Sequence, residues 1–166
     1  MSKKLFLLPL LLLSVVLFTP GCGEEDPCKN VECGANGTCF EGACVCNEGF
    51  EGSGCDTEWS AKFVTTYNGT DVCANGTFDY DQAITRVSES TVLLNDLGGT
   101  VYDITANISR INANDAGAEK ISWNVTSAGL TFKGEGTITG TTVTGSYTIA
   151  NGGTITDNCS FTWTKK

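Results

Sequence analysis

Histidine is absent from this sequence of 166 residues. Without an imidazole, the chain cannot build a Ser-His-Asp or Cys-His catalytic centre, and it cannot hold a metal through histidine. Nucleophile elbows, phosphate-binding loops and arrays of metal-ligating residues are also missing from the sequence. We therefore expect no catalytic residue, no metal site and no cofactor, and we predict that the protein is not an enzyme.

Basic residues are scarce, since Lys and Arg number 10 against 19 Asp and Glu. Lys3 and Lys4 lie near the N-terminus, so the residues from Cys22 onward carry 8 basic and 19 acidic side chains, a net charge of −11. Such a field repels phosphate groups, which argues against nucleic acid and anionic lipid as partners. Proline is rare, with 3 residues, whereas 20 glycines and many threonines favour a turn-rich β protein.

The first segment, residues 1–21, is predicted to be a signal peptide. Lys3 and Lys4 provide its positive charge, and residues 5–18 are almost wholly apolar. This apolar run is too short to span a membrane comfortably and has the length of a secretion signal. We therefore expect the rest of the chain to be exported.

The leader ends at residues 18–22 in Phe-Thr-Pro-Gly-Cys, which resembles a bacterial lipobox. Gly21 supplies the small residue before the cysteine, whereas the two residues before Gly21 depart from the usual pattern. The resemblance implies that Cys22 carries lipid, with acyl chains of the palmitate type, and anchors the protein to a membrane. The count of nine cysteines agrees, because six form one cluster, two lie far downstream and Cys22 is left over. A free thiol or an intermolecular disulfide at Cys22 is the alternative.

Residues 22–26 form an acidic tether after the leader, with the sequence Cys-Gly-Glu-Glu-Asp. An acidic run directly after a lipid-bearing cysteine resembles the surface-export signal of Bacteroidota lipoproteins. A simple solvated linker has the same composition. The resemblance implies a lipoprotein of the bacterial outer membrane that is exposed at the cell surface.

Six cysteines lie within residues 28–55, where few large apolar residues could form a core. Such a module must be held together by disulfides, which form in an oxidising compartment. Its end carries a Cys-x-Cys pair, then Gly49 with the aromatic Phe50, then Gly52 three residues before the last cysteine. This pattern resembles an EGF-like domain, which we assign to residues 27–56. The resemblance implies the disulfides Cys28–Cys39, Cys33–Cys44 and Cys46–Cys55.

Calcium binding is a property of many EGF-like domains and needs several oxygen ligands. Glu24 and Asp26 could match the acidic residues that precede the first cysteine in the calcium-binding subfamily. However, Pro27 stands where that subfamily has Glu or Gln, and its later Asn or Asp with a following aromatic is missing. We therefore expect a rigid spacer or a recognition element rather than a calcium site.

The pattern changes from residue 57 onward, where apolar and polar residues alternate repeatedly. Clear examples are Ile121, Trp123 and Val125, and the final run from Ile155 to Trp163. Turn signals rich in Asn and Gly separate eight or nine such segments, and no segment has helical periodicity. Residues 57–166 are therefore predicted to be an all-β domain, an antiparallel meander that closes into a barrel or, alternatively, forms a β-sandwich.

Residues 134–149 contain a Gly-x-Gly-x-Ile-x-Gly run followed by a Ser-Tyr strand. This ending resembles the lipocalin-like domains of small Bacteroidota lipoproteins, which implies a β-barrel with the capacity to hold a ligand. Cys73 and Cys159 are the one pair outside the cluster and the leader. In an exported protein we expect them to form a disulfide between the first and last strand regions.

The acidic residues of this domain are candidates for catalytic roles. Asp79 and Asp81 alternate with aromatic residues and should point to solvent. Asp157 alternates in phase with Cys159 and should point inward, where it could pair with Arg86 or Arg110. The remaining aspartates of this domain lie in turn-like contexts: Asp71, Asp96, Asp103 and Asp115.

Two functions remain open on this basis. The first is a lipid-anchored extracellular binding or adhesion protein, with the membrane as one partner and a protein or a glycan as the other. The second is a carrier of a small hydrophobic ligand inside the barrel, although the aromatic residues could equally fill the interior. The polar junction at residues 56–58 also predicts that the two domains fold and unfold independently.

Overall fold

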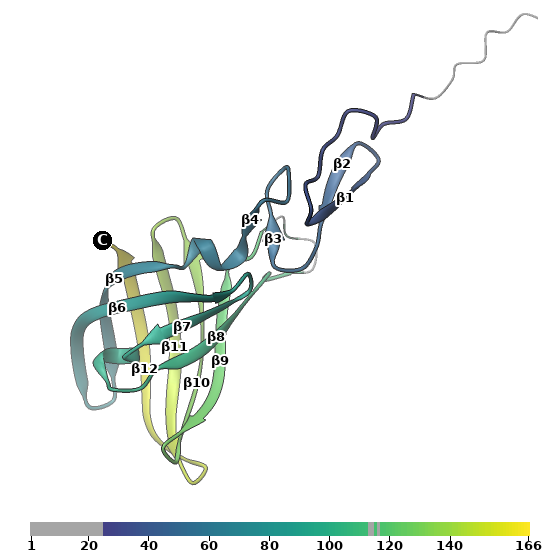
Figure 1. The fold of residues 1–166 in the computed structure, drawn as a ribbon. Coiled ribbons are helices and arrows are strands. Elements are labelled where there is room, and N and C mark those ends of the chain that lie inside the picture. Colours follow the sequence, from purple (N-terminus) through teal and green to yellow (C-terminus); the bar gives the residue numbers. More distant parts are fainter. Residues whose placement is uncertain (1–24, 113–114, 116) are drawn as a thin grey trace, which may run out of the picture.

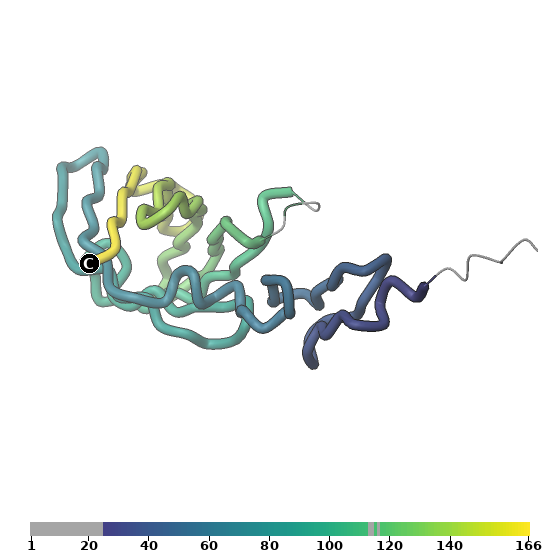
Figure 2. Tube along the Cα trace, turned by 90° about the horizontal axis from the view of Figure 1, so that it is seen from above, coloured from purple at the N-terminus to yellow at the C-terminus, as the bar shows by residue number. Residues whose placement is uncertain are grey.

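The computed structural model describes residues 25–112, 115 and 117–166. The expected signal peptide, the lipidation site at Cys22 and most of the acidic tether lie outside the described residues. The described chain is mainly β, with a small N-terminal module that projects from a larger barrel in two perpendicular views (Figures 1 and 2). No helix among the described residues has both the length and the apolar character needed to cross a membrane.

The N-terminal module consists of short strands tied together by disulfides. The structure joins Cys28 to Cys39, Cys33 to Cys44 and Cys46 to Cys55. Antiparallel pairing sets Cys39 directly opposite Cys44 at the centre of the first hairpin, so alternate residues point to the disulfides. Its strands are β1 (Gly37–Phe40), β2 (Ala43–Cys46), β3 (Phe50–Glu51) and β4 (Thr57–Glu58).

The expected domain boundary between residues 56 and 57 falls inside a small sheet. β4 pairs with β3 across it, with Phe50 opposite Glu58 and Glu51 opposite Thr57. A short 3₁₀ helix, η1 (Trp59–Lys62), then leads into the barrel. The junction is therefore a paired and folded segment, which a polar composition alone did not indicate.

The larger part is a closed barrel of eight antiparallel strands in meander order, with β12 returning to β5. This confirms the predicted meander barrel, and the alternative of a β-sandwich is wrong. A further 3₁₀ turn, η2 (Leu97–Gly99), lies between β7 and β8. The strands are β5 (Thr65–Cys73), β6 (Gly76–Ser88), β7 (Thr91–Asn95), β8 (Ile104–Ser109), β9 (Lys120–Ser127), β10 (Leu130–Thr139), β11 (Thr142–Asn151) and β12 (Thr154–Lys165).

The barrel closes where its first and last strands meet. Cys73 of β5 stands directly opposite Cys159 of β12, and the structure joins them by a disulfide. The bridge links residues 86 positions apart, so it restricts a long loop of the unfolded chain. Its position ties together the two ends of the meander.

Large side chains fill the barrel interior. Trp163 is fully buried and stacks on Phe161, with ring centroids 4.1 Å apart. Trp123 and Tyr67 pack against the same indole at 6.3 and 6.4 Å. Gly134 gives these rings room, because a Cβ there would lie only 2.5 Å from the ring of Trp123. The inward aromatic residues are therefore core residues, packed as in other small barrels.

Candidate functional site

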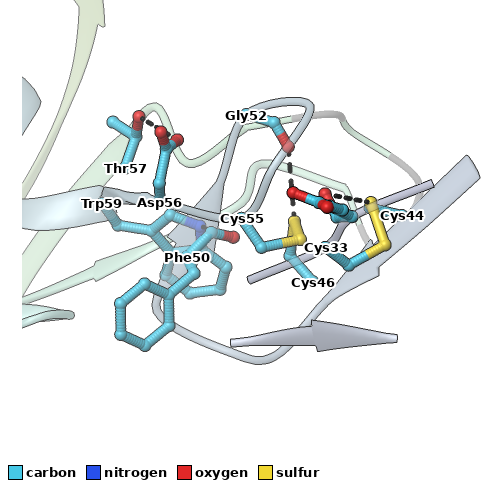
Figure 3. The surroundings of a disulfide bond; sticks show 10 residues. Cys33, Cys44, Cys46, Phe50, Gly52, Cys55, Asp56, Thr57 and Trp59 are labelled. Atoms are coloured by element: carbon cyan, nitrogen blue, oxygen red, sulfur yellow. Dashed lines mark hydrogen bonds between the residues drawn. A yellow bond between two sulfur atoms is a disulfide. The ribbon is translucent and has the colours of Figure 1, made fainter. Parts of the chain in front are cut away.

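The joint between the two parts is built around Trp59 (Figure 3). Its backbone N–H donates to Gly49 O at 2.9 Å and its indole N–H donates to Phe50 O at 3.0 Å. Both acceptors belong to the disulfide-rich module, whereas the ring itself is buried with the barrel core. The guanidinium of Arg110, at the end of β8, lies 5.4 Å from the centre of the Trp59 ring. Trp59 therefore belongs to both parts.

Glu51 reinforces this joint from the module side. Its carboxylate lies 2.8 Å from Lys62 Nζ and accepts a hydrogen bond from the backbone N–H of Ala118 at 3.0 Å. Lys62 in turn donates to Ala118 O at 3.2 Å, so three chain segments meet at one point. Glu51 is nearly buried, and a buried carboxylate needs such partners.

A second ion pair supports the same joint at the surface. Arg86 donates two hydrogen bonds to the carboxylate of Glu58, at 2.6 and 2.9 Å. These bonds are the main reason that the pKa of Glu58 lies below its ordinary value. Arg86 is thus committed to Glu58, and Arg110 lies over Trp59. In the structure, neither arginine pairs with Asp157 as the sequence had suggested.

Asp71 is the acid whose position differs most from the prediction. It lies in β5 and is fully buried inside the barrel, so its assignment to a turn is wrong. Its carboxylate accepts hydrogen bonds from the hydroxyls of Tyr80 and Tyr147, at 2.6 and 2.5 Å. The indole N–H of Trp163 donates to the Tyr80 hydroxyl at 2.8 Å and extends the network. Burial raises the pKa of Asp71, against the opposing effect of the two hydroxyls.

The other acids of the barrel have local roles. Asp79 and Asp81 are exposed, as expected, and bind Thr70 Oγ1 and Lys166 Nζ at 2.6 Å each. Asp157 lies near the sulfurs of Cys73 and Cys159. Because those sulfurs form a disulfide, they cannot act as thiolate ligands for a metal. Three acids lie in or beside loops: Asp96, Asp103 and Asp115.

The disulfide-rich module holds its acids in local contacts as well. Asp26 accepts a hydrogen bond from the backbone N–H of Cys28 at 2.9 Å, which closes a short turn. Glu24, the other acid considered for calcium, lies outside the described residues. The structure thus assigns Asp26 a role in the turn that precedes the first disulfide.

A groove of about 620 Å³ crosses the outer face of the barrel from β8 to β12. Cross-strand pairing arranges its side chains in two rows. One row contains Ser122, Glu135 and Ser146, and the other contains Asn124, Lys133 and Thr148. Between them lies the backbone of Trp123, Gly134 and Tyr147. The side chains of Trp123 and Tyr147 point into the core. Asn107 and Ile155 complete the lining.

The chemistry of the groove is polar and nearly balanced in charge. Its hydroxyl and amide groups can donate and accept hydrogen bonds, while Lys133 and Glu135 contribute one charge of each sign. A salt bridge of 2.7 Å to Lys120 is the main reason that the pKa of Glu135 lies below its usual range. Ile155 is largely exposed and adds one apolar surface. The lining of the groove is therefore chemically suited to neutral polar groups.

Sequence reasoning missed both Asp71 and the groove. Asp71 could have been found, because Phe63, Tyr67 and Asp71 recur at intervals of four residues on the inward face. The groove residues could be assigned to the outside of their strands by the same alternation. Their assembly into two rows depends on strand register, which the sequence does not display.

Comparisons with known proteins support the N-terminal assignment. Residues 28–58 match the model of the Teneurin-like EGF domain. Together with the three disulfides there, this confirms the resemblance of this part of the chain to an EGF-like domain. The match ends at Glu58, the last residue of β4, two residues beyond the expected boundary.

The remaining comparisons are distant. No curated protein matches the chain. The structure is similar to the crystal structure of a proposed outer membrane protein of Bacteroides fragilis, with 19% sequence identity and a TM-score of 0.39. That match covers 64% of this chain and 52% of the other, so the chain spans about half the length of that protein. A likeness of this size supports no conclusion about function.

Proposed function

We propose that this protein is a non-enzymatic, lipid-anchored binding protein of the bacterial cell surface, which holds a carbohydrate in the groove across β8–β12. The observation that carries the proposal is the groove itself, a concave surface of about 620 Å³ lined by hydrogen-bonding side chains. This volume lies within the range of roughly 300–1,000 Å³ typical of sites for small ligands.

A carbohydrate suits the groove better than an ionic ligand. Sugar hydroxyls both donate and accept hydrogen bonds, as do the side chains of the two rows. Most lining side chains are uncharged and Glu135 is paired with Lys120, which favours a neutral ligand, whereas the acidic chain as a whole disfavours a polyanion. Ile155 offers an apolar contact for the C–H face of a sugar ring.

The packed interior favours an external site over a carrier cavity. Tyr67, Phe132 and Trp163 are each at most 1% exposed and occupy the inward face of their strands. Asp71 already receives two hydroxyl donors from within the barrel. A hydrophobic ligand would have to displace these rings, which argues against a role as a carrier.

The arrangement of the two parts fits presentation from a membrane. The described chain enters at the end of the EGF-like module that lies away from the barrel (Figure 1). An anchor at Cys22 would therefore place the module next to the membrane and the barrel farther out. The joint at Trp59 and Glu51 would make the module a stiff support for the groove.

The proposal is tested by glycan-array binding of the mature chain carrying Cys22→Ser, which keeps every described residue. We expect one class of neutral glycan to be retained. Asn124→Ala and Lys133→Ala should each weaken that binding, by about fivefold for a lost hydrogen bond of ~1 kcal/mol. Asn68→Ala provides the matched control, because Asn68 is an exposed asparagine on β5, outside the groove.

Two results would contradict the proposal. Equal binding by the groove variants and the Asn68→Ala control would place the ligand elsewhere on the molecule. Retention of no glycan at all, by a protein with its four disulfides intact, would remove carbohydrate as the ligand class.

A further inference from the structure

The first hairpin of the EGF-like module has an exposed apolar face, although Val45 at one end of it also lines a pocket with Arg110 and Asp115 of the barrel part. In β1 and β2 the cysteines point to the disulfides, whereas Thr38, Phe40, Ala43 and Val45 point outward and are exposed. Phe40 is 64% exposed and Val45 is 58% exposed. Pairing sets Phe40 opposite Ala43 and Thr38 opposite Val45, so the four side chains form one continuous patch.

The Phe40–Ala43 end of this patch lies beside the turn, where the described chain enters the module. The hairpin turn contacts Pro27, since a Cβ on Gly42 would lie 3.4 Å from Pro27 O and 3.6 Å from Pro27 Cβ. Phe40 stands directly before that turn. Pro27 follows Cys22 by five residues, and five extended residues span at most about 17 Å. A lipid on Cys22 would therefore hold the turn and Phe40 close to the bilayer surface.

We infer that the outer face of the β1–β2 hairpin rests on the lipid surface to which Cys22 anchors the chain, an inference that depends on the lipid anchor of the proposed function. A ring such as Phe40 gains from leaving water at the boundary between headgroups and acyl chains. The anchor keeps the patch at high local concentration, so a contact too weak to bind alone suffices.

The charges around the patch select the kind of lipid. Glu41 lies in the hairpin turn, and Glu25 and Asp26 lie just before Pro27. These acids disfavour anionic headgroups, so the surface that fits this face is zwitterionic. The contact fixes how the module stands on the membrane, and through the joint at Trp59 it sets the direction in which the groove faces.

The test uses the full lipidated chain in vesicles of phosphatidylcholine with brominated acyl chains, which quench an indole at the interface. Phe40→Trp introduces such a reporter on the patch, and Ala43→Trp repeats the measurement at the position directly opposite Phe40. Val72→Trp is the control, since Val72 is 54% exposed on the barrel strand β5. The native tryptophans are buried in the barrel, so the wild-type signal can be subtracted.

We expect the emission added by Phe40→Trp and Ala43→Trp to be largely lost in brominated vesicles, and that added by Val72→Trp to be retained. If the acylated protein is on the vesicles and neither hairpin reporter is quenched, the inference is wrong and the anchor stands. If mass spectrometry finds no acyl chain on Cys22, the anchor is wrong. The inference then falls with it, while binding of glycans by the groove remains a separate measurement.

Discussion

Asp71 shows how one residue can join several strands of the barrel. Its carboxyl group accepts from Tyr80 of β6 and Tyr147 of β11, while Asp71 itself belongs to β5. An unpaired buried carboxyl group would be strongly unfavourable, so these two donors are required by its position. The network therefore restrains strands that lie at different points of the barrel wall.

The first prediction concerns the pH dependence of stability. Burial raises the pKa of Asp71 above its ordinary value of 3.8, so the folded chain holds this proton more tightly than the unfolded chain. The resulting stabilisation is complete below the unfolded pKa and is lost as the pH rises through the folded pKa. Asp71→Asn cannot ionise, so its free energy of unfolding should change less from about pH 3 to about pH 8 in chemical denaturation.

The matched control is Asp79→Asn, because Asp79 is exposed on the neighbouring strand. That variant should keep the pH dependence of the wild type. Parallel curves for the wild type and Asp71→Asn would show that Asp71 does not titrate differently in the folded chain.

At the scale of elements, the strands of the barrel could be predicted well because apolar and polar residues alternate along each of them. The phase of one strand end could not be predicted. Ile155 was expected to face inward with Cys159, yet it is 62% exposed. The cause is a register shift between Ile149 and Ala150. Ile149 pairs with Asp157 and Ala150 pairs with Ile155, so Thr156 is an extra residue in β12. A bulge of this kind depends on pairing with a neighbour, which the strand's own sequence does not reveal.

The second prediction concerns Gly134, which lies at the centre of β10 beneath the groove. A Cβ there would lie 2.5 Å from both Trp123 Cζ2 and Tyr147 Cβ, and Tyr147 Cβ cannot move away without its backbone. Gly134→Ala should therefore destabilise the barrel by about 1–3 kcal/mol, as expected for overpacking. This steric cost should outweigh the roughly 0.4–1 kcal/mol that Gly-to-Ala changes gain through the unfolded chain. Denaturation monitored by near-ultraviolet circular dichroism measures the net change in stability that results from these two effects.

Gly54→Ala serves as its control, because no atom lies within 4 Å of a Cβ at that position. The control should be neutral or slightly stabilising. An equal loss of stability in both variants would show that crowding between Trp123 and Tyr147 is not the cause of the effect.

At the scale of the whole molecule, the cysteine spacing indicated an EGF-like module but not how the module meets the barrel. The contacts of Glu51 with Lys62 and Ala118 join residues that are far apart in the sequence. The side chain of Trp59 crosses the expected boundary as well. No local pattern encodes such contacts, so the polar composition of residues 56–58 suggested an independent pair of domains. The observed joint leads us to expect that the two parts are coupled in stability.

The third prediction tests this coupling through Glu51→Ala. The change leaves the N–H of Ala118, a fully buried residue, without its carboxylate acceptor and removes the ion-pair partner of Lys62. We expect the barrel to lose about 1–3 kcal/mol of stability, the usual cost of an unsatisfied buried group. Small-angle scattering should also show a broader range of module orientations. Glu48→Ala, an exposed acid of the same module, should change neither quantity.

A fragment of residues 57–166 extends the same test, because it removes the contacts that Glu51, Phe50 and Gly49 make at the joint, while the Glu58–Arg86 pair remains. The eight strands and the Cys73–Cys159 bridge remain, so the fragment should fold. However, β4 loses its partner β3, and the indole of Trp59 loses the carbonyl of Phe50. Its stability should therefore fall below that of Glu51→Ala in denaturation under oxidising conditions. A fragment as stable as the barrel of the intact protein would show that the joint orients the two parts without stabilising either.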